Sequence, residues 1–277
     1  MTNQQRPVTV TTLAAMKSRG ERITCLTAYD ASLARVMAEA GVDMILVGDS
    51  LGMVVQGHDT TLPVTLDEMI YHSRCVARGI AQAQPLGQVR PPLLMVDLPF
   101  MSYATPEQAL YSAGRLMKEG GAQMVKLEGG AAQLASVQAL TAQGIPVCAH
   151  LGLTPQSVHK LGGYKVQGRE AVAAEAMLQD AQGLQQAGAD MLLVECIPST
   201  LAARLRAGLS IPLIGIGAGA ECDGQVLVST DVLGLSAQPP RFALDYAQTY
   251  GAPRQAIAAF IEDVRAGRFP QAAQCFS

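Results

Sequence analysis

One structural unit recurs along the chain: a helix that ends at glycine, a short turn and an apolar strand. It is seen in AEAGVDMILVGDS (38–50), KEGGAQMVKLEGG (118–130) and QQAGADMLLVEC (185–196). Glycine suits the helix end because the chain must enter the left-handed backbone region there. Two variants begin the strand with proline, QGIPVCAHLG (143–152) and LSIPLIGIGAG (209–219). This alternation of strand and helix indicates an α/β protein with a parallel sheet.

Three further segments bring the expected number of strands to eight: 22–30, 91–100 and a weaker one at 223–234. Eight strands alternating with helices predict a closed (β/α)8 barrel of the TIM type. The 277 residues fit such a barrel, which typically takes roughly 250. We expect a single domain over residues 1–277, with a helical tail after about Arg241. The alternative is an open, doubly wound sheet.

Several of the expected helices carry recognisable start signals. Thr65 and Glu68 have the spacing of a capping box, in which each residue hydrogen-bonds the backbone of the other. Thr105 precedes Pro106, and a cap followed by proline is a preferred helix start. Residues 169–187 form an alanine-rich segment that also predicts a helix.

Charged side chains stand at the C-terminal ends of several apolar strands. They are Asp49, Asp97, Lys126, Glu128 and Glu195. A charge at the end of a buried strand is costly unless it is paired or binds a metal. Open α/β folds and closed barrels both place their chemistry at this end of the strands. The pattern therefore predicts one shared polar site at one rim of the barrel.

The carboxylates of this site suit a hard divalent cation. Asp49, Asp97 and Glu128 end three consecutive strands, and Lys126 leaves the same strand face as Glu128. Mg²⁺ typically takes one or two carboxylates and completes its octahedron with water and substrate oxygens. Without a cation, two unit charges ~4 Å apart repel by about 4 kcal/mol at an effective dielectric constant of about 20. The alternative is that each carboxylate is a solvated strand-end charge or a helix cap.

Two further residues on the rim are candidates for chemistry. Glu195 lies between apolar residues, and desolvation raises the pKa of a carboxyl group and makes it a better base. The alternative for Glu195 is an ion pair with an arginine such as Arg204. His150 ends the fifth strand and is either a substrate contact or a structural hydrogen-bonding residue.

Two glycine-rich segments are less specific. GIGAG (215–219) follows the seventh strand, where barrels often bind phosphate. These glycines are equally suited to a tight turn or to close approach of a flat ligand. GGYKVQG (162–168) is either a mobile lid or a plain turn.

Composition excludes several classes of function. The net charge is -3, aromatic residues make up 4% and tryptophan is absent, which argues against nucleic-acid binding. No apolar run approaches the ~20 residues of a membrane helix, and the N-terminus lacks the apolar core of a signal peptide. The six cysteines form no CxxC pair, so we expect reduced thiols in a cytoplasmic protein. Charged residues are only 16%, which favours burial of apolar surface between subunits.

Taken together, these motifs resemble the ketopantoate hydroxymethyltransferase (3-methyl-2-oxobutanoate hydroxymethyltransferase) family. The resemblance runs from about Val8 to Phe269. The stretches that carry it are TAYD (27–30), LVGDSLGMVVQGHDTTLPVT (46–65), DLPFMSYATPEQA (97–109), MVKLEGG (124–130), HLGLTPQSV (150–158), GGYKVQGR (162–169), LLVEC (192–196) and IGIGAG (214–219).

The resemblance implies a β/α barrel that assembles as a decamer, binds Mg²⁺ and uses 5,10-methylenetetrahydrofolate as its one-carbon donor. The Mg²⁺ ligands that it implies are Asp49, Asp97 and Glu128. The keto-acid contacts that it implies are Asp49, Ser50, Asp97 and Lys126, and Glu195 matches the proton acceptor. The chain departs from the family around residues 82–91 and in its glutamine-rich tail, and we expect both departures to lie outside the site.

Two other functions remain as alternatives. One is a Mg²⁺-dependent lyase or mutase that acts on a related 2-oxo acid. Such enzymes often carry a reactive cysteine in a mobile loop, and residues 162–168 contain none. The other is a non-catalytic barrel that serves as a scaffold, which would retain strand-end carboxylates at a cost in stability.

Overall fold

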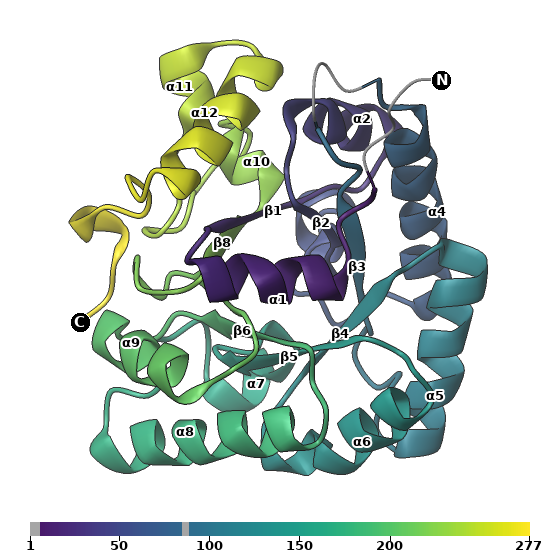
Figure 1. Ribbon diagram of the computed structural model, residues 1–277, viewed down its shortest axis with the longest axis vertical. Coiled ribbons are helices and arrows are strands. Elements are labelled where there is room, and N and C mark those ends of the chain that lie inside the picture. The colour runs from purple at the N-terminus through teal and green to yellow at the C-terminus, as the bar shows by residue number, and fades with distance from the viewer. Residues whose placement is uncertain (1–5, 85–88) are drawn as a thin grey trace.

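The structure is a computed structural model that describes residues 6–84 and 89–277. Eight parallel strands close into a barrel in sequence order (Figure 1). The strands are β1 (Ile23–Thr27), β2 (Met44–Val47), β3 (Leu93–Asp97), β4 (Met124–Glu128), β5 (Val147–Gly152), β6 (Met191–Glu195), β7 (Leu213–Ile216) and β8 (Gly224–Leu227). Pairing of β1 with β8 closes the sheet, so the predicted (β/α)8 barrel is confirmed and the open sheet is excluded.

Helices surround the barrel and connect its strands (Figure 1). They are α1 (Val10–Arg19), α2 (Ala31–Ala40), α3 (Leu51–Val54), α4 (Leu66–Gln82), α5 (Pro106–Arg115), α6 (Leu134–Ala142), α7 (Val158–Leu161), α8 (Ala171–Gln186), α9 (Ser199–Gly208), α10 (Ser229–Val232), α11 (Tyr246–Tyr250) and α12 (Pro253–Arg265). After Arg241 the chain forms two helices, α11 and α12. The chain then returns toward α9, next to which it ends (Figure 1).

The predicted helix starts are confirmed in atomic detail. The backbone N–H of Thr65 donates to Glu68 Oε2 at 2.7 Å, and the N–H of Glu68 donates to Thr65 Oγ1 at 3.3 Å. Thr105 accepts from the N–H of Gln108, and Pro106 is the first residue of α5. Within the two described ranges, no helix has the length and apolar character needed to cross a membrane.

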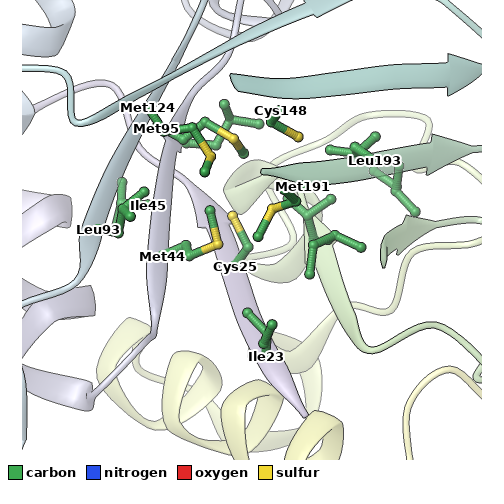
Figure 2. Packing of buried hydrophobic residues seen from close by; sticks show 14 of the residues in the cluster. Ile23, Cys25, Met44, Ile45, Leu93, Met95, Met124, Cys148, Met191 and Leu193 are labelled. Atoms are coloured by element: carbon green, nitrogen blue, oxygen red, sulfur yellow. The ribbon is translucent and has the colours of Figure 1, made fainter. Parts of the chain in front are cut away.

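Sulfur-containing side chains fill the barrel interior below the charged C-terminal ends of the strands. They are buried and face one another inside the barrel (Figure 2): Cys25, Met44, Met95, Met124, Cys148 and Met191. Methionine adapts well to such irregular space. Asp97 and Lys126 follow Met95 and Met124 by two positions, so they leave the same strand faces one layer higher. The apolar layer therefore forms the floor of a polar site.

Candidate active site

A cavity of about 550 Å³ lies at the C-terminal end of the strands, the end at which barrels place their chemistry. Every predicted site residue lines it: Asp49, Ser50, Asp97, Lys126, Glu128, His150 and Glu195. The seven residues thus share one cavity, and their individual roles stay predictions.

The centre of this site is a buried ion pair between neighbouring strands. The register of β3 and β4 sets Asp97 beside Lys126, and Lys126 Nζ lies 3.0 Å from Asp97 Oδ1. Burial alone would lower the pKa of Lys126, but the nearby carboxylates of Asp97, Glu128 and Asp49 outweigh burial and raise it above its usual value. Lys126 is therefore a permanent cation in the cavity.

Gln156 links two of the carboxyl groups. Its side-chain Nε2 donates to Asp49 Oδ2 at 2.8 Å and to the Leu98 carbonyl at 2.9 Å. Its backbone N–H donates to Glu128 Oε2 at 3.0 Å. The Tyr103 hydroxyl donates to the side-chain oxygen of Gln156, which fixes the orientation of the amide. Asp49 and Glu128 are thereby held by one residue of the segment after β5.

The carboxyl groups of the cavity resist ionisation. Burial, followed by the charges of Asp97 and Glu128, raises the pKa of Asp49 well above its usual value. Burial raises the pKa of Glu128 to about 7, against the opposing effect of Lys126. Burial, followed by the charge of Glu128, raises the pKa of Glu195 to about 8. The protein alone therefore supplies too little positive charge for all of these groups to be ionised at neutral pH.

His150 lies between Glu195 on one side and Lys126 and Glu128 on the other. Its Nδ1 is 3.4 Å from Lys126 Nζ and 3.5 Å from Glu128 Oε1. Burial, followed by the charge of Lys126, lowers the pKa of His150 well below its usual value, so the ring is neutral at pH 7. An ammonium group only donates, so Nδ1 is the acceptor and Nε2 carries the hydrogen. That N–H lies 3.5 Å from Glu195 Oε2, longer than an ordinary hydrogen bond.

Glu195 faces the cavity and is not paired with Arg204. Arg204 instead lies 3.2 Å from Glu175, so the predicted alternative of a Glu195–Arg204 ion pair is wrong. Gly152 makes room for this strand end, because a Cβ at that position would lie 2.3 Å from the Glu195 carbonyl oxygen. The residue after Glu195 is Cys196, whose φ of 47° is uncommon for a side chain other than glycine. Such backbone strain is typical of functional sites.

Ser50 is held at the edge of the same site. Its Oγ lies 2.8 Å from the Tyr29 hydroxyl. A Cβ at Gly48 would lie 2.8 Å from Ser50 Oγ and 3.5 Å from Asp97 Oδ2. Glycine at position 48 therefore allows the hydroxyl and the carboxylate to approach one another.

The residues fit a divalent cation in charge and in unsatisfied oxygen atoms. Asp49, Asp97, Glu128 and Glu195 line one cavity with Lys126, and the buried Glu128 Oε1 accepts no hydrogen bond from residues 6–84 or 89–277. Within the described part of the chain, however, no three His, Cys, Asp or Glu side chains are spaced as a complete set of metal ligands. Mg²⁺ suits such a site because it retains several waters and uses few protein carboxylates. The ligand set Asp49, Asp97 and Glu128 remains a prediction.

The two glycine-rich segments both contribute to the cavity wall. Tyr164 and Lys165 line it, and the Tyr164 hydroxyl lies 3.4 Å from Met53 Sδ. Gly217 has a φ of 59°, and a Cβ there would lie 2.8 Å from Phe242 Cδ1 and 3.1 Å from Phe276 Cε2. Glycine at this position thus admits two aromatic rings of the chain itself.

The expectation that the glutamine-rich tail lies outside the site is wrong, since Phe276 lines the cavity. The tail reaches it because the Ser199 N–H donates to the Phe276 carbonyl at 3.0 Å. Of the other departure, around residues 82–91, residues 85–88 lie outside the described part of the chain. Val89 and Arg90 line a different cavity, beside α1.

Gln156 and Tyr103 were not predicted from the sequence as site residues. Both lie within stretches that resemble the family, HLGLTPQSV and DLPFMSYATPEQA. Neither ends a strand, and neither carries a charge at pH 7. Only the closed barrel shows that they bind the carboxyl groups.

Comparisons with known proteins identify the family and agree with the fold. The sequence matches the family described as ketopantoate hydroxymethyltransferase over residues 7–272. It is 57% identical over 263 residues to a 3-methyl-2-oxobutanoate hydroxymethyltransferase of Halorhodospira halophila, covering 95% of this chain and 92% of the relative. It is 56% identical over 273 residues to the protein of the same name from Alkalilimnicola ehrlichii, covering 98% and 95%.

Solved structures share the barrel at low sequence identity. A 2,3-dimethylmalate lyase of the PEP mutase/isocitrate lyase superfamily matches with a TM-score of 0.55 and 18% identity, covering 94% of this chain and 97% of the lyase. An oxaloacetate acetylhydrolase in complex with oxalate matches with a TM-score of 0.59 and 18% identity, covering 83% of each chain. These structures show the fold alone. The sequence matches over almost the whole chain show that it belongs to the ketopantoate hydroxymethyltransferase family of transferases.

Proposed function

We propose that this chain transfers a hydroxymethyl group from 5,10-methylenetetrahydrofolate to 3-methyl-2-oxobutanoate, giving 2-dehydropantoate (ketopantoate) in pantothenate biosynthesis. The names of relatives that are 54–57% identical support the reaction. The observation that carries the proposal is a single cavity that joins a permanent cation, Lys126, to a carboxyl group of raised pKa, Glu195.

The reaction requires removal of the proton at C3 of the keto acid, next to the carbonyl group. Glu195 is the base because its carboxyl group faces the cavity and has a pKa of about 8, close to the operating pH. The neutral His150 directs its Nε2 toward Glu195 Oε2.

Lys126 and Ser50 bind the substrate carboxylate in this mechanism. Lys126 is charged and lines the cavity, and the Ser50 hydroxyl is oriented by Tyr29. A fixed carboxylate places C3 within reach of Glu195. His150 is a further candidate contact for the keto acid on the same rim.

Asp49, Asp97 and Glu128 would hold the Mg²⁺ ion, partly through water. A bound divalent cation supplies Lewis-acid stabilisation of the negative charge that develops on the keto oxygen. Gln156 and Lys126 keep the carboxylates in place on either side. Water cleaves the two C–N bonds of the methylene bridge, so its oxygen stays on the one-carbon unit and its two protons pass to N5 and N10 of the departing tetrahydrofolate. Carbon 3 then adds to this formaldehyde-level carbon, and the proton held by Glu195 returns to the new hydroxyl oxygen.

We also propose that the protein is a cytoplasmic homo-oligomer, with the decamer of the resemblance as the expected assembly. Large apolar side chains are exposed on the outer helices, among them Val172 (84%), Tyr111 (66%) and Tyr71 (63%). Such side chains favour burial against further copies of the chain.

The direct test is turnover of 3-methyl-2-oxobutanoate with 5,10-methylenetetrahydrofolate, with and without Mg²⁺, followed by mass spectrometry of the product. We expect ketopantoate and tetrahydrofolate in equal amounts, and only with the metal. Absence of ketopantoate under both conditions would contradict the proposed reaction.

A further inference from the structure

The catalytic cavity has a second half that the keto-acid chemistry does not use. It lies beyond the ends of β7 and β8, and its wall is completed by α10 and the C-terminal tail. Its distinctive residues are Asp231, Ser236, Arg241, Phe242 and Phe276. None of them was predicted from the sequence, and they differ in character from the carboxylate and lysine cluster.

Asp231 is a buried carboxyl group in this wall. The residue is only 5% exposed, yet it lines the cavity. The Ser236 hydroxyl donates to its Oδ1 at 2.5 Å, and within the described ranges no lysine, arginine or histidine forms a salt bridge with it. Burial raises the pKa of Asp231 above its usual value. A buried carboxyl group without a cation is costly. Asp231 is therefore suited to a ligand whose N–H groups donate hydrogen bonds to it.

An aromatic wall stands in the same half of the cavity. Phe242 and Phe276 both pack over Gly217, whose missing side chain leaves room for the two rings. The Arg241 guanidinium lies 5.4 Å from the centre of the Phe276 ring, a cation–π arrangement. Arg241 itself is exposed at the mouth, where its only side-chain hydrogen bond within the described ranges goes to the Ala273 carbonyl. A flat ring with an anionic extension complements such a wall.

We propose that this half of the cavity binds the folate co-substrate, with Asp231 accepting hydrogen bonds from the 2-amino group and N3–H of its pteridine ring. This inference rests on the proposed function. The two N–H groups stand side by side on the pyrimidine edge, so they match the two oxygens of one carboxylate. Phe242 and Phe276 cover the flat part of the ligand, and Arg241 attracts its glutamate carboxylates.

The placement also orients the reaction. The transferred carbon of 5,10-methylenetetrahydrofolate bridges N5 and N10, at the side of the pteridine remote from its 2-amino group. With that amino group at Asp231, the transferred carbon points away from α10, toward the half of the cavity that holds Lys126 and Glu195. Asp231 is therefore a binding and specificity residue for the donor and takes no part in proton removal.

The test compares the wild-type protein with Asp231→Asn, which keeps the shape but presents one acceptor and one donor. Binding of tetrahydrofolate under anaerobic conditions is measured by titration calorimetry. A second probe carries a methyl group in place of the 2-amino group. We expect Asp231→Asn to weaken tetrahydrofolate binding by about 10–100-fold, since it removes the charge and sets an N–H against one of the two ligand donors. The methyl probe keeps N3–H but lacks the 2-amino donor, so its affinity should differ less between the two proteins than that of tetrahydrofolate.

A control measures exchange of the C3 proton of 3-methyl-2-oxobutanoate in heavy water without folate. This exchange depends on the keto-acid site with Lys126 and Glu195 and on an intact fold. It should be unchanged in Asp231→Asn. Phe276 lies in the tail after α12, outside the strands of the barrel. Phe276→Ala should therefore weaken tetrahydrofolate binding without affecting the barrel. Phe100→Ala removes a ring that is 43% exposed and does not line the cavity, and should leave binding unchanged.

The outcomes separate the inference from the function on which it rests. Equal tetrahydrofolate affinity of wild type and Asp231→Asn, with normal exchange in both, would overturn the role of Asp231 and leave the proposed reaction standing. Normal exchange without any folate binding by the wild type would overturn both the inference and the proposed donor. Absence of exchange in the wild type would overturn the proposed keto-acid chemistry itself.

Discussion

Gln156 Nε2 donates a hydrogen bond of 2.8 Å to Asp49 Oδ2, so the segment after β5 holds a carboxyl group that follows β2. The two residues are 107 positions apart in the sequence. The backbone N–H of the same glutamine binds Glu128. One neutral residue, whose side chain is oriented by the Tyr103 hydroxyl, therefore bridges two of the proposed metal ligands through its amide group and its backbone N–H.

Replacement of Gln156 by methionine should lower the stability of the protein. The change keeps the length of the side chain but leaves the buried Asp49 Oδ2 without its donor, at a cost of about 1–3 kcal/mol. Urea unfolding measures this loss. Gln138→Met is the matched control because Gln138 is exposed on α6, and its effect should stay within about 0.5 kcal/mol. Equal effects of the two changes would contradict the role given to Gln156.

Metal binding should depend on Asp97. Treatment with EDTA should abolish turnover, and added Mg²⁺ should restore it. Asp97→Asn removes one negative charge from the crowded site and should weaken Mg²⁺ binding, as measured by calorimetry. Asp67→Asn removes a carboxylate that is 79% exposed, and it should leave Mg²⁺ affinity unchanged. Full activity in a verified metal-free preparation would rule out the metal site.

The stability of the metal-free protein should fall as the pH rises. The pKa of Glu195 is raised from 4.5 to about 8 in the folded state, first by burial and then by Glu128. The folded protein therefore keeps a proton that the unfolded chain releases. The stabilisation is fully present below about pH 4.5 and is lost as the pH passes through about 8.

This one proton contributes a slope of at most ~1.4 kcal/mol per pH unit in the free energy of unfolding. Chemical unfolding across the window measures the slope. Glu195→Gln should make it shallower by about that amount, because glutamine does not titrate. An unchanged slope in the variant would show that the carboxyl group of Glu195 ionises normally.

A homo-oligomer is expected from the exposed apolar side chains of the outer helices. Light scattering at micromolar concentration should give a mass several times the 29.0 kDa of the chain, with a decamer as the expected assembly. A monomer mass that is stable on dilution would refute this expectation.

The fold and the charged part of the site followed from strand periodicity. Asp97, Lys126 and Glu128 end apolar runs, and in a closed parallel barrel the ends of neighbouring strands converge. The same logic placed Glu195 in the cavity although it lies 67 residues after Glu128 in the chain. A charged residue in an apolar run is informative because its burial is costly.

Strand periodicity could not predict residues that reach the cavity only because a loop or the C-terminal tail folds back toward it. Gln156 lies in a short 3-10 turn with no periodicity of its own, and only the path of that turn brings it to Asp49. Phe276 enters the cavity because the tail runs back to α9, where the Ser199 N–H binds its carbonyl group. Asp231 lies within the weakest of the predicted strand segments, 223–234, and no apolar run marks it as buried.

The central claim is that Glu195 removes the C3 proton of the keto acid before the folate reacts. Wild-type protein with Mg²⁺ and 3-methyl-2-oxobutanoate in heavy water should exchange that proton, as followed by NMR, without any folate. Glu195→Gln should slow exchange by about 10²–10⁴, the usual contribution of a general base, while keto-acid binding is retained through Lys126 and Ser50. Exchange at the wild-type rate in Glu195→Gln, together with lost binding, would contradict the account and give Glu195 a positioning role instead.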